Sequence, residues 1–498
     1  MRPVTLRMML EALPEARVTG SPEGCVASVV CDSRDVVPGS MFVAIRGGQE
    51  LDRHRFLPDA VARGARVLVV EDRQASAAWP QCTVVQVPDT RRALARLAAV
   101  YYGNPGASLQ LIGVTGTNGK TTTALLLQQI LQANGTRCGY LGTLGVHTEA
   151  GHRMLANTTP EAPELHAQLR HLVDGGAASA ILEVSSHGLA LERVSGLRFE
   201  AAVFTNLSRD HLDFHGTEQR YLDAKARLFE NLSQGAVAWL NADDAATPEL
   251  KRRCAVPART YGRNPQADWR LTAIEAGSDA SVLHMEMPQG NLSVSTPLLG
   301  SFNAMNVTAA AACSVSLGVP LEVVVQGIGS LRRIPGRFET VDCGQPFRVL
   351  VDYAHTPAGL DNVLGAAREI TRGRLLCVFG CGGDRDAGKR PLMGQVAERL
   401  ADRVFVTSDN PRSEDPLEII RQIAAGMERA GDAVVQEDRR KAIAAALADA
   451  RAGDTVVIAG KGHEEGQIVG NRVIPFDDAA VVRELLQPQT AVDQEMAG

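Results

Sequence analysis

The sequence predicts an α/β fold divided into three domains, and three observations lead to this prediction. The chain has 498 residues, which at roughly 150 residues per domain favours three packed units. Short runs of Val, Ile, Leu and Phe alternate with helical stretches along most of the chain. Aromatic residues make up only 4% while there are 47 glycines, a composition that suits close packing of helices on sheets.

Nine apolar runs are predicted to be strands. They lie at residues 65–72, 109–116, 179–186, 201–208, 236–243, 347–354, 374–383, 402–409 and 454–462. Continuous apolar strands of this kind indicate parallel sheets that are covered on both faces. Several runs end in Gly, Ser, Asp or Asn, and ligands of open parallel sheets gather at the carboxyl ends of strands. We therefore expect the chemistry in the loops that follow these runs.

Two breaks divide the chain. The apolar helix stripe of Leu94, Leu97, Ala98 and Tyr101 stops at residues 103–106, where the sequence is Gly-Asn-Pro-Gly, and a strand follows. A second break lies near residues 334–336, between a helical region and the strand at 347–354. The predicted domains are residues 1–106, 107–334 and 335–498.

Composition and charge exclude several classes of protein. The balance of 51 Lys and Arg against 57 Asp and Glu gives a net charge of −6, so no global basic field would collect nucleic acid or an anionic membrane. No run approaches the roughly 20 apolar residues that span a bilayer, and the first 20 residues lack a signal-peptide core. We expect a cytoplasmic protein, a monomer, with no membrane insertion. None of the nine cysteines has C-x-x-C spacing, which favours buried free thiols.

A phosphate-binding loop is the strongest local signal. Residues 113–122 read Gly-Val-Thr-Gly-Thr-Asn-Gly-Lys-Thr-Thr and lie between a predicted strand and a predicted helix. Backbone N–H groups would curl around phosphate oxygens, Lys120 would neutralise their charge, and Thr121 could offer its hydroxyl to Mg²⁺. The usual spacing places a glycine where this chain has Val114, so the loop is a variant. The alternative is a glycine turn with a solvated lysine.

Two later side chains are candidate magnesium ligands. Glu183 ends a buried strand, where a carboxylate facing the phosphate loop suits Mg²⁺, although it could instead cap a helix or form an ion pair. His211 follows the strand at 201–208. Because imidazole is an unusual magnesium ligand, the residues alone favour a structural histidine.

Lys225 is the least ordinary residue of this region. At helical spacing it shares a face with Tyr221, Leu228 and Phe229, so it points to the apolar side of its helix. A buried lysine tends to lose its proton, and a neutral amine can react with CO₂ to form a carbamate that would bind Mg²⁺. Snorkelling or ion pairing is the competing interpretation, and the residues alone favour it.

Eight motifs occur in a fixed order. They are GTNGKTT (116–122), EVSSH (183–187), NLSRDHLDFH (206–215), Y-x-x-A-K-x-x-L-F (221–229), GSFNAMN (300–306), GRFE (336–339), DYAHTP (352–357) and GKGHE (460–464). Together they resemble the Mur ligase family, ATP-dependent enzymes that build the stem peptide of peptidoglycan. The resemblance covers nearly the whole chain and is most specific over residues 111–464.

The resemblance implies a role for each domain. Residues 1–106 would be an N-terminal α/β domain that binds a nucleotide sugar, residues 107–334 a central P-loop-type parallel-sheet ATPase domain, and residues 335–498 a C-terminal Rossmann-like domain that binds an amino acid. The substrates would be ATP and UDP-N-acetylmuramoyl-L-alanyl-D-glutamate. Asp-Ser-Arg at 32–34 and Asp-Asn-Pro-Arg at 409–412 are similar to the members that add the third amino acid, and the Asn-Pro-Arg form implies meso-diaminopimelate.

Site residues carry over from the family to matching positions. Catalysis would involve Lys120, Glu183, His211 and Lys225. ATP would contact Gly116, Thr117, Asn118, Gly119, Lys120, Thr121, Thr122, Asn303, Arg337 and Asp352. Magnesium would be held by Thr121, Glu183, His211 and a carbamate on Lys225. The UDP-sugar would contact Ser33, Gly48, Gln49, Asn157, Thr158, Thr159, Ser185 and Arg193. Diaminopimelate would contact Arg385, Asp409, Asn410, Arg412, Gly460 and Glu464.

The implied reaction is the formation of an amide on the D-glutamate side-chain carboxylate through an acyl phosphate and a tetrahedral intermediate. Arg53 and Leu191 depart from the pattern that many relatives show, so the sugar pocket is the least defined part. Without the family, Asp-Asn-Pro-Arg is a polar turn after a strand. The alternatives are a lysine-adding or folylpolyglutamate-type ligase of the same architecture, and a non-catalytic ATP-binding switch.

Overall fold

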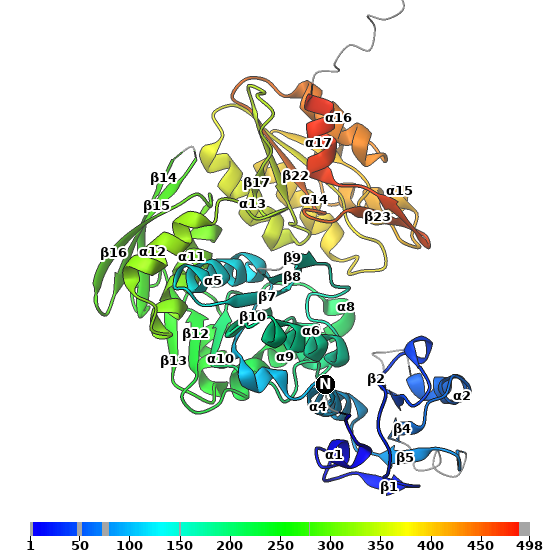
Figure 1. Ribbon diagram of the computed structural model, residues 1–498. Coiled ribbons are helices and arrows are strands. Elements are labelled where there is room, and N and C mark those ends of the chain that lie inside the picture. Colours follow the sequence, from blue (N-terminus) through cyan, green and yellow to red (C-terminus); the bar gives the residue numbers. More distant parts are fainter. Residues whose placement is uncertain (1–2, 47–51, 72–78, 149–150, 278, 488–498) are drawn as a thin grey trace, which may run out of the picture.

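The computed structural model describes residues 3–46, 52–71, 79–148, 151–277 and 279–487. Strands in these ranges form three large sheets in succession along the chain and one two-stranded hairpin. Figure 1 shows the three sheets as separate parts of the molecule, from blue through green to yellow and red. Within these ranges, no helix is both long and apolar enough to cross a membrane.

The first sheet has five strands in the order β1-β5-β4-β3-β2, of which only β1 is antiparallel to its neighbour. Its strands are β1 (Arg17–Thr19), β2 (Val29–Val30), β3 (Met41–Val43), β4 (Val67–Val70) and β5 (Thr83–Gln86). Its helices are α1 (Leu6–Leu10), α2 (Leu57–Ala62) and α4 (Thr90–Tyr101). Asp89 caps α4, whose Leu94, Leu97 and Ala98 are buried against the sheet.

The second sheet has eleven strands in the order β16-β15-β14-β13-β12-β11-β6-β10-β7-β8-β9. They are β6 (Gln110–Thr115), β7 (Cys138–Gly142), β8 (Gly145–Thr148), β9 (Gly151–Arg153), β10 (Ser179–Glu183), β11 (Ala201–Phe204), β12 (Val237–Asn241), β13 (Ala258–Gly262), β14 (Trp269–Ala276), β15 (Ser281–Met287) and β16 (Gly290–Thr296).

Only the centre of this sheet, from β7 to β14, is parallel as the sequence predicts. The strands at both ends pair antiparallel, so the sheet is mixed. In β16 buried and exposed side chains alternate, as expected for a strand with one solvated face, and this pattern differs from the continuous apolar runs used to predict strands.

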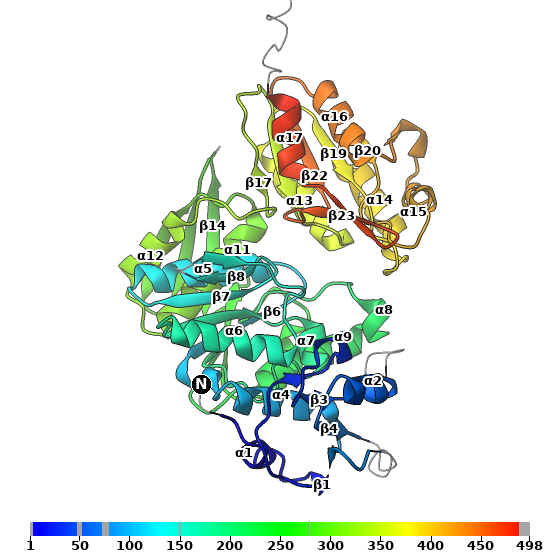
Figure 2. The same ribbon diagram turned by 45° about the vertical axis from the view of Figure 1, so that its right-hand side comes forward.

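Helices cover both faces of the second sheet, as Figure 2 shows for α5 and α6 on opposite sides of its strands. One face packs against α5 (Lys120–Ala133), α11 (Ser301–Ser316) and α12 (Leu321–Ser330). The other packs against α6 (Ala162–Asp174), α7 (Ser186–Ala190), α9 (Glu218–Glu230) and α10 (Thr247–Arg253), while the short α8 (Leu212–His215) precedes α9.

The third sheet has the order β17-β18-β22-β19-β20-β21, with only β17 antiparallel. Its strands are β17 (Glu339–Thr340), β18 (Arg348–Asp352), β19 (Leu375–Phe379), β20 (Arg403–Val406), β21 (Val434–Val435) and β22 (Thr455–Ala459). On one face lie α13 (Pro357–Ile370), α14 (Lys389–Leu400) and α15 (Pro416–Ala424), and on the other α16 (Arg439–Asp449) and α17 (Asp478–Leu486). A hairpin of β23 (Gly466–Val469) and β24 (Arg472–Pro475) follows β22.

All nine predicted runs contain a strand, namely β4, β6, β10, β11, β12, β18, β19, β20 and β22, which confirms the α/β fold. The domain boundaries at 106 and 334 stay predictions. The first lies between β5 and β6 and the second between β16 and β17. Because β6 pairs with β10 on one side and β11 on the other, the loops after these three strands leave the same edge of the second sheet.

Candidate active site

The loop after β6 has the geometry of a phosphate cradle. Gly119 is the N-cap of α5 and has a φ of +84°, while Gly116 has a φ of +150°. A Cβ at Gly116 would lie 1.8 Å from the hydroxyl of Thr205, so only glycine fits. Lys120 Nζ donates to the carbonyls of Gly116 and Thr117, both at 2.9 Å, and closes the loop on itself. The loop therefore combines a helix N-terminus with an ammonium group.

Glu183 lies at the carboxyl end of β10 and is only 1% exposed. Its Oε1 accepts hydrogen bonds from the Tyr140 hydroxyl and from the backbone N–H of Thr143. Its Oε2 accepts from the hydroxyls of Thr121 and Thr143, each at 3.1 Å. Its backbone partner, Thr143, lies between β7 and β8 and not in a helix, so Glu183 is not a helix cap. The carboxylate instead contacts the side chain of Thr121 in the first turn of the phosphate-loop helix.

The side chain of Lys225, on α9, is 1% exposed and lies beneath the phosphate loop. Its Nζ donates to the Gly116 carbonyl at 2.8 Å and lies 4.3 Å from the centre of the Tyr221 ring. Burial, and to a smaller extent repulsion from Lys120, lowers the pKa of Lys225 well below its usual value. The side chain is buried, which excludes the snorkelling interpretation, and in the part of the chain that the structure describes Lys225 forms no ion pair with a carboxylate.

His211 has a φ of +54° and precedes α8. Burial lowers its pKa to about 3, so its imidazole is neutral at neutral pH and has a free lone pair. The neighbouring Asp210 is buried, and burial alone would raise its pKa, yet His355 and His211 together lower it. Asp210 Oδ2 lies 3.3 Å from His211 Nε2 and 3.7 Å from His355 Nε2. His355 follows β18, so this carboxylate joins the second and third sheets.

The donor set around the loop suits a magnesium ion. A hydroxyl (Thr121) and a carboxylate (Glu183) are in contact, and both are oxygen donors of the kind that Mg²⁺ binds beside nucleotide phosphates. In the described ranges, no three His, Cys, Asp or Glu side chains converge as a metal cage. A cation here would thus take its remaining ligands from phosphate oxygens, water or other donor types.

A pocket of about 440 Å³ opens beside the loop where the second sheet meets the third. Arg337 crosses this junction, because its Nη2 donates to the Thr121 hydroxyl at 3.1 Å and its guanidinium lies over the Tyr353 ring. Asp352 is held by the backbone N–H groups of Phe338 and Ala354, both at 2.7 Å. The lining includes Asn118, Gly119, Thr122, Asn206, Phe302, Met305, Asn306, Arg337, Asp352 and Ala358.

Asn303 and Asn306 differ in their access to this pocket. Asn303 is 2% exposed, and its Nδ2 donates to the Leu299 carbonyl at 2.8 Å. Asn306 lines the pocket, and its Oδ1 accepts from the Thr123 hydroxyl at 3.3 Å. Its Nδ2 donates to Asn303 Oδ1 at 3.2 Å. Sequence reasoning selected Asn303 and missed Asn306.

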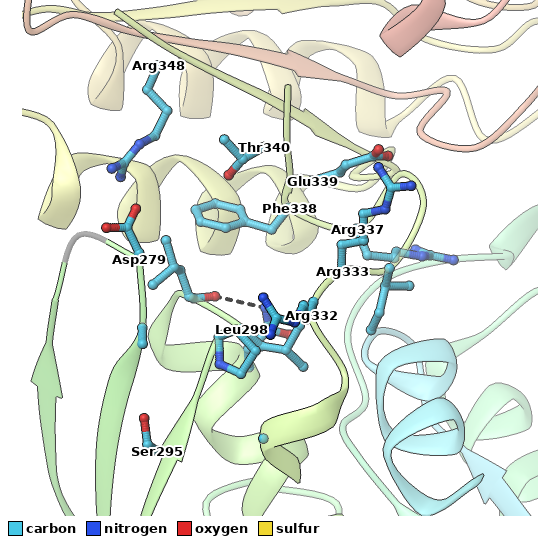
Figure 3. A pocket seen from close by; sticks show the side chains of 16 residues that line it. Asp279, Ser295, Leu298, Arg332, Arg333, Arg337, Phe338, Glu339, Thr340 and Arg348 are labelled. Atoms are coloured by element: carbon cyan, nitrogen blue, oxygen red, sulfur yellow. Dashed lines mark hydrogen bonds between the residues drawn. The ribbon is translucent and has the colours of Figure 1, made fainter. Parts of the chain in front are cut away.

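Asn303 lines a second pocket of about 550 Å³. Figure 3 shows this pocket. Arg332, Arg333, Arg337 and Phe338 belong to the linker between α12 and β17, and Glu339 and Thr340 form β17. Ser295 comes from β16, Asp279 precedes β15 and Leu298 follows β16. The pocket lies behind the linker that joins the second and third sheets.

Several residues predicted to bind the nucleotide sugar come together behind Glu183. The Thr159 hydroxyl donates to the Glu183 carbonyl at 2.7 Å and accepts from the N–H of Ser185 at 2.9 Å. Arg193 Nη1 donates to the Thr159 carbonyl at 2.8 Å. Thr158 shares a 3.1 Å hydrogen bond with Thr143, while Asn157 is exposed. Ser33 lies apart in the first domain and is buried, and Gly48 and Gln49 fall outside the described residues.

The residues predicted to bind an amino acid lie at the carboxyl ends of β19, β20 and β22. Asn410 Nδ2 donates to Glu464 Oε2 at 2.8 Å, and Arg412 Nη1 donates to the Gly383 carbonyl at 2.7 Å. Gly460 has a φ of +114°, and a Cβ there would lie 2.6 Å from Asp409 Oδ2. Burial and repulsion from the positive charge of Arg385 lower the pKa of Arg412, so two positive charges influence each other in a site suited to an anion.

Two models of known families match this chain, the Mur ligase middle domain over residues 114–314 and the Mur ligase glutamate ligase domain over residues 336–462. A relative from Geobacillus kaustophilus, named UDP-N-acetylmuramoyl-L-alanyl-D-glutamate--2,6-diaminopimelate ligase, is 45% identical over 93% of this chain and 95% of its own length. The chain belongs to the Mur ligase family.

Solved structures of Mur ligases and of related enzymes share this fold. A structure of UDP-N-acetylmuramoyl-L-alanyl-D-glutamate--2,6-diaminopimelate ligase is 35% identical, has a TM-score of 0.68 and covers 97% of this chain and 98% of that one. Mycobacterium tuberculosis folylpolyglutamate synthase, complexed with ADP and AMPPCP, has a TM-score of 0.64 at 20% identity, with 74% and 92% of the two chains covered, which shows the shared fold alone.

Besides Asn306, sequence reasoning missed several residues that shape this Mur ligase site. Tyr221 donates to or accepts from the Thr117 hydroxyl at 3.1 Å and covers Lys225. Asn206 Oδ1 accepts from the N–H of Asn118 at 2.9 Å. Both lie in motifs that mark the family, at 221–229 and 206–215. The motifs could therefore have identified them, but only the ionisable residues of these motifs were selected as candidates.

Proposed function

We propose that this chain is an ADP-forming ligase that joins meso-diaminopimelate to the D-glutamate side-chain carboxylate of UDP-N-acetylmuramoyl-L-alanyl-D-glutamate during peptidoglycan precursor synthesis. The observation that carries this proposal is the Thr121 hydroxyl, which donates to Glu183 and accepts from Arg337. It brings the phosphate loop, a buried carboxylate and the third domain to one point. The names of the relatives that match over the whole chain support these substrates.

Activation of the carboxylate is the chemical problem, because its reaction with an amine would have to expel oxide. Transfer of the γ-phosphoryl group of ATP to the carboxylate gives an acyl phosphate, whose leaving group is phosphate. Lys120 offsets negative charge as the two anions approach. Thr121, Glu183, His211 and a carbamate on Lys225 would hold Mg²⁺, which supplies further charge neutralisation when bound.

The carbamate on Lys225 is supported by the burial of its amine. Burial lowers the pKa of Lys225, which raises the fraction of the side chain present as the neutral amine, and only the neutral amine attacks CO₂. The reaction forms an N–C bond and releases one proton. The product replaces a neutral amine with an anionic oxygen donor near the Gly116 carbonyl.

ATP would occupy the 440 Å³ pocket, with its phosphates against the loop residues Gly116, Thr117, Asn118, Gly119, Lys120, Thr121 and Thr122. Its base would lie among Asn306, Arg337 and Asp352, which line this pocket, whereas Asn303 lines the neighbouring pocket. The nucleotide sugar would contact Ser33, Gly48, Gln49, Asn157, Thr158, Thr159, Ser185 and Arg193. Arg193 donates a hydrogen bond to the Thr159 carbonyl, which favours a preformed pocket.

Selection of the amino acid would depend on Arg412. Diaminopimelate has a carboxylate at its far end that lysine lacks, and a guanidinium group can hold that carboxylate with two parallel hydrogen bonds. Arg385, Asp409, Asn410, Gly460 and Glu464 complete the subsite. The amine then attacks the acyl phosphate through a tetrahedral intermediate, and phosphate leaves as the amide forms.

The contacts between Arg209 and Asp386 (3.3 Å) and between Asp210 and His355 (3.7 Å) join the second and third domains. We infer that these domains close over the substrates and exclude water from the acyl phosphate. The enzyme would act in the cytoplasm as a monomer.

The decisive experiment supplies the purified protein with ATP, Mg²⁺, the nucleotide-linked dipeptide and one amino acid at a time, and measures phosphate release. We expect release that requires the dipeptide and diaminopimelate together. Equal rates with lysine would favour a lysine-adding ligase, and tight nucleotide retention without turnover would favour a switch.

A further inference from the structure

Lys461 lies directly behind the amino-acid subsite and is fully buried. Its Nζ donates to three oxygens: Asn410 Oδ1 at 3.0 Å, Glu464 Oε2 at 2.9 Å and the Gly466 carbonyl at 2.7 Å. An ammonium group has three N–H donors, so every donor of Lys461 is used within the protein. The side chain therefore has no donor left for a substrate, and its role must act through its neighbours.

The ammonium group fixes which way the Asn410 amide points. Asn410 Oδ1 accepts from Lys461 and from the backbone N–H of Ile468 at 2.9 Å, so the oxygen side of the amide faces two donors. The Asn410 Nδ2 group is then directed at Glu464 Oε2. Rotation of the amide by 180° would place its NH₂ against two donors, which is unfavourable.

The same ammonium group orients Glu464. Two donors, from Lys461 and Asn410, meet at Oε2. Among the described residues, no donor reaches Oε1. One carboxylate oxygen is thus tied down and the other stays available for the ammonium group of an incoming amino acid.

The choice of lysine at this buried position is informative. Only six of the 51 basic residues of the chain are lysine. An ammonium group is a compact charge that can meet three acceptors arranged around one point, whereas the planar fork of arginine cannot. Position 461 therefore requires the compact ammonium group of lysine, and the guanidinium group of arginine would not fit the three acceptors.

We propose that Lys461 is a positioning residue for the amino-acid substrate, which presets Asn410 and Glu464 without touching the substrate itself. This inference rests on the proposed function, since it assumes that the subsite binds diaminopimelate. It predicts that loss of Lys461 weakens use of the amino acid, while ATP and the nucleotide sugar still bind normally outside the amino-acid subsite.

The test uses two variants of Lys461. Lys461→Met keeps the length of the side chain and removes its donors. Lys461→Gln keeps some hydrogen bonding and replaces the first variant if that variant does not fold. Lys441→Met is the control, because Lys441 is exposed on α16 of the same domain. Steady-state phosphate release gives KM for each of the three substrates. We expect KM for diaminopimelate to rise roughly ten- to a hundredfold, the loss expected for charge-assisted hydrogen bonds. KM for ATP and for the nucleotide sugar should change less than about twofold.

Three results would overturn the inference. A KM for diaminopimelate that stays within twofold of the parent value would remove the positioning role. Equal increases in all three KM values would show a general structural role instead. A parent protein that releases no phosphate with diaminopimelate would remove the proposed function and this inference together, and so differs from the first two results.

Discussion

Arg439 and Asp478 form a fully buried ion pair, in which Nε and Nη2 of the guanidinium donate to Oδ1 and Oδ2 of the carboxylate at 2.7 Å. Arg439 also donates to the carbonyl of Ala459 at 3.0 Å and reaches that of Ser408 at 3.5 Å. These two carbonyls directly precede Gly460 and Asp409. The pair therefore anchors α16 and α17 to the strand ends that carry the amino-acid subsite.

Arg439→Met should destabilise the third domain by about 3–5 kcal/mol, because it leaves the Asp478 carboxylate buried and without its partner. The measurement is urea or thermal unfolding followed by circular dichroism. Arg440→Met is the control, since Arg440 pairs with Glu484 across the same two helices but on the surface, and it should unfold with the parent protein. Similar midpoints for the two variants would contradict the prediction. The double variant Arg439→Met/Asp478→Leu should recover much of the loss.

Lys225→Ala should lower phosphate release at least ten- to a hundredfold, the range observed when a group that supports a metal ligand is removed. Added short carboxylates such as acetate should restore part of the rate, because they can replace the carbamate oxygens. Lys251→Ala, at an exposed position of α10, should keep the parent rate. Full activity of Lys225→Ala would exclude the carbamate.

Arg412→Lys should raise KM for diaminopimelate roughly ten- to a hundredfold and leave KM for ATP unchanged, because a lysine cannot hold a carboxylate with two parallel hydrogen bonds. The measurement is phosphate release at varied amino acid and varied ATP. Arg421→Lys, exposed on α15, is the matched control. An equal loss in both KM values would argue against a role in selection.

Asn306→Ala should raise KM for ATP about tenfold, as expected for one lost hydrogen bond to a base, and should spare KM for diaminopimelate. Asn303→Ala should have the smaller effect, because Asn306 lines the 440 Å³ pocket whereas Asn303 lines the neighbouring one. Asn291→Ala, exposed on β16, provides a baseline. If Asn303→Ala has the larger effect, Asn303 is the residue that contacts the base.

Thiol labelling should separate the cysteines by burial. Cys25 and Cys343 are exposed, whereas burial raises the pKa of Cys138, Cys313, Cys377 and Cys381 to about 12. A raised pKa leaves little thiolate at pH 8, so these four should react with iodoacetamide only after unfolding. Mass spectrometry of the native protein should find modification at Cys25 and Cys343. The sequence predicted free thiols correctly but did not identify these two exposed ones.

The sequence predicted nine of the parallel strands because their side chains are apolar without interruption, and it predicted the phosphate loop because Gly116, Gly119 and Lys120 lie at a fixed spacing. It missed other parallel strands, among them β3, β5 and β7, which are short or contain glycine. It did not predict the antiparallel strands β14 to β16, whose alternating pattern is weaker over seven or eight residues. Hairpins of this kind depend on pairing partners that local periodicity does not reveal.

Site residues on one helix were harder to distinguish. Asn303 and Asn306 are one turn apart on α11, so both lie on the same face of the helix. Their sequence spacing does not show that Asn306 lines the 440 Å³ pocket and Asn303 the neighbouring one. Lys461 was missed for a related reason. Its partners Asn410 and Gly466 come from the loop after β20 and the start of β23, and the sequence does not show that these segments meet.

Arg412 has a φ of +53°, a left-handed conformation that costs an arginine on the order of 1 kcal/mol relative to glycine. Its backbone is held there by hydrogen bonds to Ile468 and Gly470 of the β23–β24 hairpin. The proposed selectivity residue Arg412 thus lies in a turn that would be more stable with glycine at this position. Exchange of Arg412 for glycine would relieve this cost, and the backbone hydrogen bonds that hold the turn would remain, since they come from the N–H and carbonyl of residue 412. The turn itself therefore does not depend on the guanidinium group that it presents.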